Sequence, residues 1–92
     1  MQKALAGKKA LVTGGGRGIG AGIARRLAED GAAVAITYSA SQDQAKALVD
    51  QLAAAGGHAI ALRADAADAA AVTHAVADTA RQLGGLDILV NN

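Results

Sequence analysis

Short apolar runs alternate with longer amphipathic stretches along the whole chain. Four runs have the length and composition of buried strands and span residues 9–13, 33–38, 59–63 and 87–90. Three stretches with helical periodicity separate them: residues 20–30, a stretch opened by Ser41 and ended by Gly56 and Gly57, and a stretch from Asp68 to residues 84–85. The pattern predicts the element order β-α-β-α-β-α-β.

Each predicted helix carries an apolar stripe and end signals. The stripes are Ile19, Ile23 and Leu27 in the first helix, Ala45, Leu48, Val49 and Leu52 in the second, and Val72, Val76 and Leu83 in the third. Gly31 is expected to stop the first helix. Ser41, with Gln44 three residues on, has the spacing of a capping box for the second, and Asp68 is the expected N-cap of the third.

The predicted strands are expected to form one parallel sheet. Each connection is long enough to hold a helix, and crossovers of this kind are right-handed. The expected fold class is therefore α/β, a doubly wound parallel sheet with strand order 3-2-1-4 and a switch point between the first and fourth strands. No linker interrupts the sequence, so residues 1–92 are expected to form a single domain.

Composition narrows the class of protein. The 92 residues include no cysteine, which excludes disulfides, thiolate catalysis and cysteine zinc sites, and a net charge of +1 with mixed signs argues against nucleic-acid binding. His58 and His74 lie far apart without matching ligands, so no metal site is expected and both are interpreted as surface residues. No membrane span or secretion signal is visible, and a cytoplasmic location is expected.

The glycine-rich stretch 13–20, Thr-Gly-Gly-Gly-Arg-Gly-Ile-Gly, carries the candidate chemistry. Glycines let the backbone approach a bulky anion, and the helix that follows directs its free N–H groups and positive dipole end at that anion. The spacing Gly14-x-x-x-Gly18-x-Gly20 between a strand and a helix favours a dinucleotide, and no Gly-Lys-Ser/Thr follows to make a Walker loop. The alternative is a glycine-rich turn that merely lets strand and helix pack closely.

Three features together resemble the short-chain dehydrogenase/reductase family over essentially the whole chain. The glycine-rich stretch resembles the family's Thr-Gly-x-x-x-Gly-x-Gly motif, Asp65 matches its acidic residue near the adenine, and residues 89–92 resemble the start of its Asn-Asn-Ala-Gly motif. The surroundings of Arg17 and of residues 37–39 are most similar to those of 3-oxoacyl-(acyl-carrier-protein) reductases. The resemblance implies a Rossmann-type fold and the N-terminal, NADP(H)-binding half of an oxidoreductase.

Residues near the second strand indicate which nicotinamide cofactor is bound. A carboxylate at its end would hydrogen-bond a ribose 2′-hydroxyl, but residues 36–41 contain no acid. A guanidinium beside hydroxyls suits a 2′-phosphate instead. The resemblance implies that Arg17 and Ser39 hold that phosphate, so NADP(H) is favoured over NAD(H). The alternative is that Arg17 is a solvated loop charge and Ser39 an ordinary turn residue.

The other candidate cofactor residues also have structural alternatives. The resemblance implies that Asp65 accepts a hydrogen bond from the adenine amino group beside Ala66, and that Asn92 lines a cofactor ribose. Asp65 could instead help to begin the third helix, and Asn91 and Asn92 could tie strand ends together. The full candidate set is Gly14, Gly16, Arg17, Gly18, Ile19, Gly20, Ser39, Asp65, Ala66 and Asn92.

No residue of the chain is a candidate catalytic group. The resemblance implies hydride transfer between nicotinamide and a carbonyl or alcohol carbon, with a serine, a tyrosine and a lysine that all lie after the fourth strand. Tyr38 is expected on the adenosine side and is not that tyrosine. Two hypotheses follow: the cofactor-binding part of an oxidoreductase with 3-oxoacyl thioester-like substrates, or a non-catalytic nucleotide-binding half-fold. Because residues 88–90 would form an apolar sheet edge, self-association or a complementing second half is also predicted.

Overall fold

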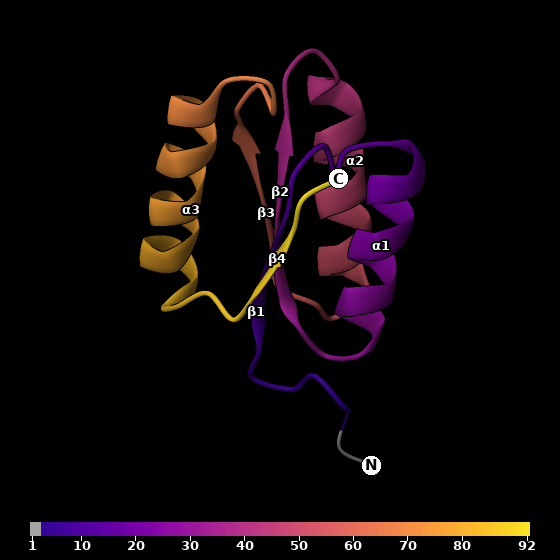
Figure 1. Cartoon of the computed structure of the whole chain (residues 1–92). Coiled ribbons are helices and arrows are strands. Elements are labelled where there is room, and N and C mark those ends of the chain that lie inside the picture. The colour runs from indigo at the N-terminus through magenta and orange to yellow at the C-terminus, as the bar shows by residue number, and fades with distance from the viewer. Residues whose placement is uncertain (1–2) are drawn as a thin grey trace.

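The computed structural model describes residues 3–92 as one parallel sheet between two helical layers (Figure 1). The elements in chain order are β1 (Lys9–Val12), α1 (Gly18–Glu29), β2 (Ala33–Tyr38), α2 (Gln42–Ala54), β3 (Ala59–Arg63), α3 (Ala69–Leu83) and β4 (Ile88–Val90). The sheet order is β3-β2-β1-β4, with every pair parallel. The predicted α/β class and strand order are confirmed. Met1 and Gln2, part of the segment searched for a secretion signal, lie outside the described residues.

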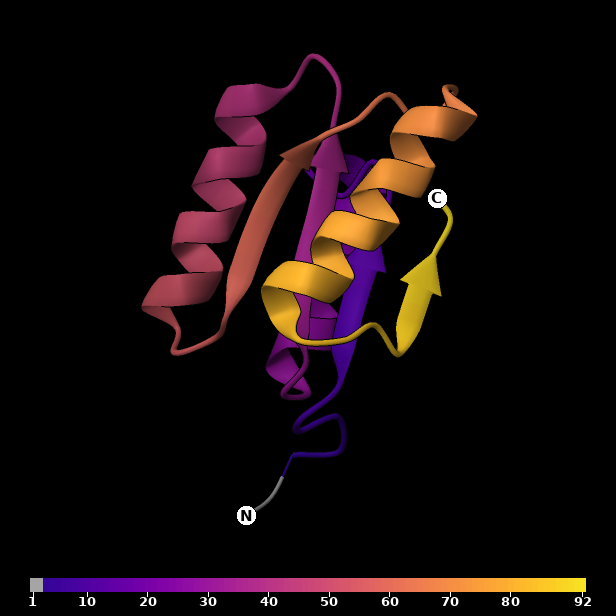
Figure 2. The same cartoon turned by 90° about the vertical axis from the view of Figure 1, so that its left-hand side faces the viewer.

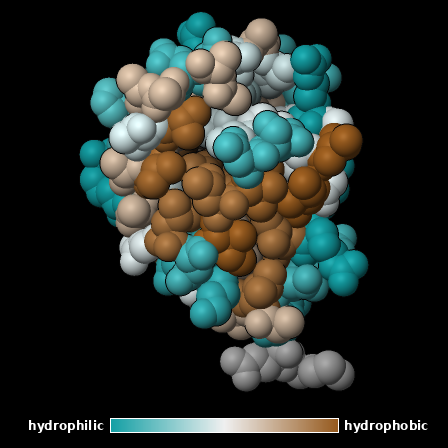
Figure 3. All heavy atoms as spheres, viewed as in Figure 1, coloured by the Kyte–Doolittle hydropathy of each residue, from teal (hydrophilic) through white to brown (hydrophobic). Residues whose placement is uncertain are grey.

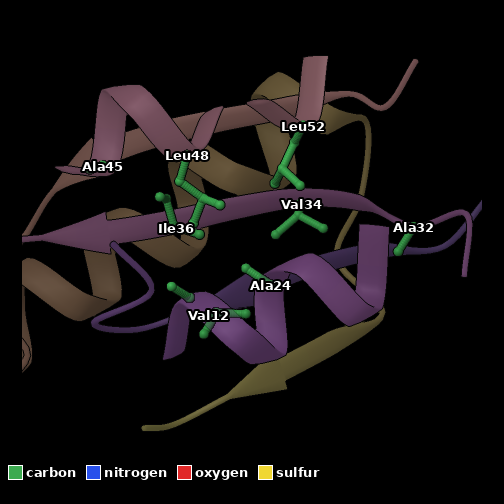
Figure 4. Close-up of a cluster of buried hydrophobic side chains, with 9 residues drawn as sticks. Val12, Ala24, Ala32, Val34, Ile36, Ala45, Leu48 and Leu52 are labelled. Atoms are coloured by element: carbon green, nitrogen blue, oxygen red, sulfur yellow. The ribbon is translucent and has the colours of Figure 1, made fainter. Parts of the chain in front are cut away.

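The two faces of the sheet bury different side chains. Helices α1 and α2 cover one face and α3 covers the other (Figures 1 and 2). Val12, Val34 and Ile36 point toward α1 and α2 and pack with Leu48 of α2 (Figure 4). Alternate residues point the other way, so a second cluster lies under α3: Leu11, Ala35, Ala64, Ala75 and Leu83. Strands buried on both faces read as continuous apolar runs, which is why the sequence revealed them.

The register of the strands places all their carboxyl ends at one edge of the sheet. Val12 at the end of β1 lies opposite Ile36 of β2 and Val90 of β4. The loops after the four strands therefore meet at this edge, which is uppermost in Figure 1. Ligands of open α/β sheets bind here, so this edge positions the candidate site.

The helix ends follow the sequence signals with one exception. The Asp68 carboxylate accepts hydrogen bonds from Ala70 N at 3.0 Å and Ala71 N at 3.2 Å, so it is the N-cap of α3 as predicted. Gly31 follows α1 with a φ of 102°, which suits its role as a helix stop. The capping box at Ser41 was wrong, because Ser41 has a φ of −101° and a ψ of 48° and caps no backbone N–H group of α2.

Ile19 does not lie on the buried face of α1, contrary to the prediction. Its side chain is 78% exposed, whereas Gly20, Ala21 and Ala24 are buried against the sheet. Small residues let α1 approach β1 and β2 closely. The other two residues of the predicted stripe, Ile23 and Leu27, are partly buried and pack against the same cluster. Helix α1 also begins at Gly18 rather than at residue 20.

Helix α3 also differs in part from its predicted stripe. Its fully buried residues are Ala75, Thr79 and Leu83. Leu83 was predicted correctly, and Val76 is half-buried and packs against the same cluster, whereas Val72 is half-buried outside it. In α2 the predicted stripe is confirmed: Ala45, Leu48 and Leu52 are buried, and Val49 packs against the same cluster.

Candidate functional site

The glycine-rich loop after β1 is fixed to the sheet by the neighbouring strand. Gly14 N donates a hydrogen bond to the Thr37 hydroxyl at 2.9 Å, and Gly15 N donates to the Thr37 carbonyl at 3.1 Å. Thr37 itself is buried within β2. A buried donor without a partner would be costly, so these two bonds hold the start of the loop in one conformation. The loop therefore presents a preformed surface.

Each glycine of the loop has its own steric reason. Gly14 and Gly18 have φ values of 63° and 61°, a region that favours glycine. A Cβ on Gly20 would collide with the Gly14 carbonyl oxygen and come within 2.8 Å of Asn92 Nδ2. A Cβ on Gly15 would lie 2.6 Å from Ile36 Cγ2, and one on Gly16 would lie 3.3 Å from Ala45 Cβ. Close packing within the chain, the alternative raised for this stretch, is therefore real at Gly15, Gly16 and Gly20.

The amino end of α1 is open to an anion. Arg17 is the N-cap residue, but its backbone is extended and no side chain caps the helix. The first bond of the helix runs from Ala21 N to the Arg17 carbonyl at 3.2 Å. The N–H groups of the turn before it have no partner within the helix, and the helix dipole adds positive charge at the same point. A negatively charged group fits this position chemically.

Thr13, which was not among the candidates, links the loop to β4. Its backbone N donates to the Val90 carbonyl at 3.0 Å, and its hydroxyl lies 3.3 Å from Asn91 Oδ1. The same hydroxyl accepts a hydrogen bond from Asn92 N at 3.0 Å, while Asn92 Nδ2 donates to the Gly14 carbonyl at 3.3 Å. Both asparagines therefore tie the ends of β1 and β4 together, as their structural alternative predicted. A threonine at the end of an apolar strand was the available signal for Thr13, and also for Thr37.

Asp65 has a local role in the turn that leads to α3. Its Oδ1 accepts a hydrogen bond from Ala67 N at 2.9 Å, and its carbonyl accepts one from Asp68 N at 2.9 Å. The structural alternative for Asp65 is thus present. Its side chain and that of the neighbouring Ala66 are exposed, so both remain accessible to a ligand.

The structure aligns the candidate residues along one edge of the sheet. In sheet order, Asp65 follows β3, Ser39 follows β2, the glycine-rich loop follows β1 and Asn92 follows β4. Arg17, Ser39 and Ile19 are exposed there. Adjacent strands lie about 4.8 Å apart, so the row spans about 14 Å, a length that suits an extended dinucleotide.

Two hollows differ in position and chemistry. One of about 560 Å³ lies at the opposite end of the sheet, lined by Lys3, by residues 6–9 and by the segments where α1 and α2 end. A smaller one of about 270 Å³ lies between α1 and α2 beside the loop, and includes Gly16, Arg17 and Gly18. We place the candidate site at the loop despite the smaller hollow, because the carboxyl edge holds the uncapped helix and the switch point between β1 and β4.

The described residues show neither a metal-ligand cluster nor a helix fit to span a membrane. Residues 3–92 contain no group of three or more potential metal ligands. His58 and His74 are both exposed. None of the helices in this range has both the length and the apolarity to cross a bilayer.

Known proteins of similar sequence include a family of dehydrogenases and curated oxidoreductases. The sequence pattern of the short chain dehydrogenase family matches residues 8–92. An uncharacterised oxidoreductase of Methylorubrum extorquens is 50% identical over 88 residues, which cover 96% of this chain and 36% of that protein. A 3-oxoacyl-(acyl-carrier-protein) reductase of Staphylococcus aureus is 46% identical over 85 residues, which cover 92% of this chain and 35% of that protein.

Two solved structures are similar to this chain in both sequence and fold. A short-chain dehydrogenase of Burkholderia cenocepacia in complex with NADP has a TM-score of 0.90 and 60% identity over 92% of this chain and 35% of its own. A blue fluorescent protein from a metagenomic library, in complex with NADPH, has a TM-score of 0.93 and 56% identity over 96% of this chain and 36% of its own. The chain thus spans about a third of the length of these proteins. It belongs to the short-chain dehydrogenase family.

Proposed function

We propose that residues 1–92 form the NADP(H)-binding half-domain of an oxidoreductase. The observation that carries this proposal is the uncapped amino end of α1, held above a glycine-rich loop at the switch point between β1 and β4. Similar structures in complex with NADP and NADPH support the same cofactor class.

The row of exposed residues suggests how the dinucleotide lies. The pyrophosphate would bind at the glycine-rich loop, where the N–H groups of α1 are free. The adenine would lie toward Asp65 and Ala66 beyond β3, and the other ribose toward Asn92 beyond β4. Ile19, exposed beside the loop, would give the cofactor an apolar contact. When bound, the dinucleotide supplies the hydride, and the chain's own residues bind and orient it.

The 2′-phosphate of NADP(H) would be held by Arg17 and Ser39. Both side chains are exposed, and no carboxylate occurs between the end of β2 and Gln42 to repel a phosphate. We therefore expect NADPH to bind more tightly than NADH, with NAD(H) as the weaker alternative ligand.

Nucleotide affinities test this assignment. Removing the Arg17 guanidinium should weaken NADPH binding about tenfold or more and leave NADH binding nearly unchanged, since a hydrogen bond to a charged group contributes about 1.5–3 kcal/mol. Arg81→Ala is the matched control, because Arg81 pairs with Asp78 on α3. Tighter binding of NADH, or Arg17→Ala without effect on NADPH, would show that the 2′-phosphate is not read here.

The chemistry of the whole protein is a broader proposal. The reductase of Staphylococcus aureus supports a 3-oxoacyl thioester-like substrate. None of the candidate residues has a catalytic role, so we expect no turnover by the 92-residue chain alone. Loss of NADPH absorbance with a β-ketoacyl thioester at enzyme-like rates would contradict that expectation. A cytoplasmic location also stays a prediction.

A second proposal concerns association through β4. Within residues 3–92, β4 pairs only with β1, and Leu89 is 52% exposed. Figure 3 shows apolar atoms gathered along the centre of the face that Figure 1 presents, where β4 runs between α3 and α1. We propose that a second copy, or a complementing segment, covers this apolar strand in solution.

A further inference from the structure

The hollow between α1 and α2 has a composition that the cofactor explains only in part, since its lining reaches beyond the glycine-rich loop to Arg25 and α2. One wall is formed by the end of the glycine-rich loop and by α1, and the other by α2: Gly16, Arg17, Gly18, Ala21 and Arg25 on the first, and Gln44, Ala47, Leu48 and Gln51 on the second. Gln44 and Gln51 are two turns apart and so lie on the same face of α2, whereas Arg17 directly precedes α1 and Arg25 lies on it. The two helices contact each other on one face of the sheet (Figure 1), and the space of about 270 Å³ between them is lined by the small side chains of Ala21 and Ala47.

The lining is cationic and rich in donors. It contains two guanidinium groups and two carboxamides but no carboxylate. The ion pairs of residues 3–92 join Arg26 to Asp30 and Arg81 to Asp78, and neither Arg17 nor Arg25 takes part in them. Each guanidinium offers five N–H donors and no acceptor. Two guanidiniums facing two amides match a tetrahedral oxyanion, which accepts several charge-assisted hydrogen bonds at once.

This hollow is not the position proposed for the 2′-phosphate. That position lies between Arg17 and Ser39, and Ser39 does not line the hollow. Arg17 belongs to both, at the boundary between them. Arg25 lies eight residues further along the chain, about 12 Å by the helix rise, and lines the hollow but is not among the cofactor candidates.

We propose that the α1–α2 hollow is a second anion site, which takes a phosphate group and shares Arg17 with the cofactor. Phosphate bound there holds the Arg17 guanidinium against Arg25 and Gln44, away from the 2′-phosphate. The anion therefore weakens NADPH binding and leaves NADH binding unchanged. This coupling rests on the proposed function, whereas the anion site itself does not.

Direct binding is measured first, without nucleotide. In a chain labelled with ¹⁵N, the arginine Nε–Hε resonances are followed while inorganic phosphate replaces chloride at constant ionic strength. The resonances of Arg17 and Arg25 should shift on one common isotherm, and those of Arg26 and Arg81 should not. Uniform shifts of all arginines would mean charge screening only, and a shift of Arg17 alone would place phosphate outside the hollow. Either result overturns the proposal.

A pair of neighbouring arginines provides matched variants. Arg25→Gln should weaken phosphate binding about tenfold, the loss expected for a hydrogen bond between charged groups. Arg26→Gln changes the net charge equally but alters a side chain that pairs with Asp30 at 3.3 Å, so phosphate affinity should stay within twofold. Equal losses in both variants would reduce the effect to net charge and refute the site. The same titration with glycerol 3-phosphate shows whether the hollow binds a phosphate monoester more tightly than the free phosphate ion.

The coupling is tested last. At constant ionic strength, phosphate should raise the dissociation constant of NADPH more than that of NADH, and Arg25→Gln should abolish the difference. Linkage requires NADPH to weaken phosphate binding by the same factor. If neither nucleotide binds, the proposed function fails while the resonance shifts still decide the anion site. If both nucleotides bind and phosphate affects them equally, the sharing of Arg17 is wrong.

Discussion

At the scale of single residues, the glycines of α1 illustrate how one residue type serves different purposes. Gly20 has no room for a side chain, since a Cβ would collide with the Gly14 carbonyl oxygen and crowd Asn92. Gly22, two residues on, is exposed and has nothing within 4 Å of the place where a Cβ would be. The glycine spacing in the sequence singles out Gly20 and not Gly22, but only the structure shows the contacts that exclude a side chain at Gly20.

Alanine substitutions at these two positions should therefore have opposite effects. Gly20→Ala should lower the free energy of unfolding by about 1–3 kcal/mol, because the loop must move to admit the methyl group. Gly22→Ala should raise it by about 0.5–1 kcal/mol, because alanine loses less backbone entropy in a helix. Urea unfolding measures both. Equal effects of the two substitutions would show that Gly20 is not in close contact with Gly14.

Thr37 offers a second residue-scale prediction. Thr37→Val keeps the shape of the side chain but leaves Gly14 N without its acceptor, which should cost about 1–3 kcal/mol of stability. Thr37→Ser keeps the hydroxyl and loses a buried methyl group instead. Amide hydrogen exchange separates the two effects: the Gly14 amide should exchange faster in the valine variant and remain protected in the serine variant. Unchanged protection in Thr37→Val would mean that this bond does not hold the loop.

At the scale of elements, substitutions at the starts of two helices test whether Asp68 and Ser41 act as caps. Asp68→Ala should destabilise the protein by about 1 kcal/mol, because two N–H groups of α3 lose their acceptor. Ser41→Ala removes a side chain that caps nothing and should change stability by only a few tenths of a kcal/mol. Thermal and urea unfolding of the pair provide the comparison. A cost at Ser41 as large as that at Asp68 would restore the capping box.

Strands were easier to predict from sequence than helix faces. The bounds of β2 and β3 match the prediction, because their apolar runs are flanked by clear turn residues. Ile19 was misplaced because periodicity identifies large apolar side chains, whereas α1 meets the sheet through Gly20, Ala21 and Ala24. The candidate site residues were proposed from their glycine spacing, their places after strands and the family resemblance, and their roles stay predictions. Thr13 and Thr37 were missed because their roles depend on hydrogen bonds between strands that only the fold brings together.

At the scale of the whole molecule, we expect the exposed β4 edge to govern the proposed association. The 92-residue chain should self-associate in sedimentation velocity experiments as concentration rises, because Leu89 and its neighbours leave an apolar strand uncovered. Leu89→Lys should shift the population toward monomer without a large loss of stability, because the replaced side chain is half exposed. Lys46→Gln, a change on the exposed face of α2, serves as the control. A wild-type chain that stays monomeric at high concentration would contradict the association proposal.

The central claim is that a dinucleotide lies along the carboxyl edge of the sheet, with its pyrophosphate at the amino end of α1. A titration with NADPH, followed through backbone amide resonances, tests it most directly. The account predicts large shifts at residues 14–20 and smaller ones at Ser39, Asp65 and Asn92, with none at Gly56 and Gly57 at the other end of the sheet. Saturable shifts confined to the hollow at that opposite end, or no shifts in residues 14–20, would contradict it.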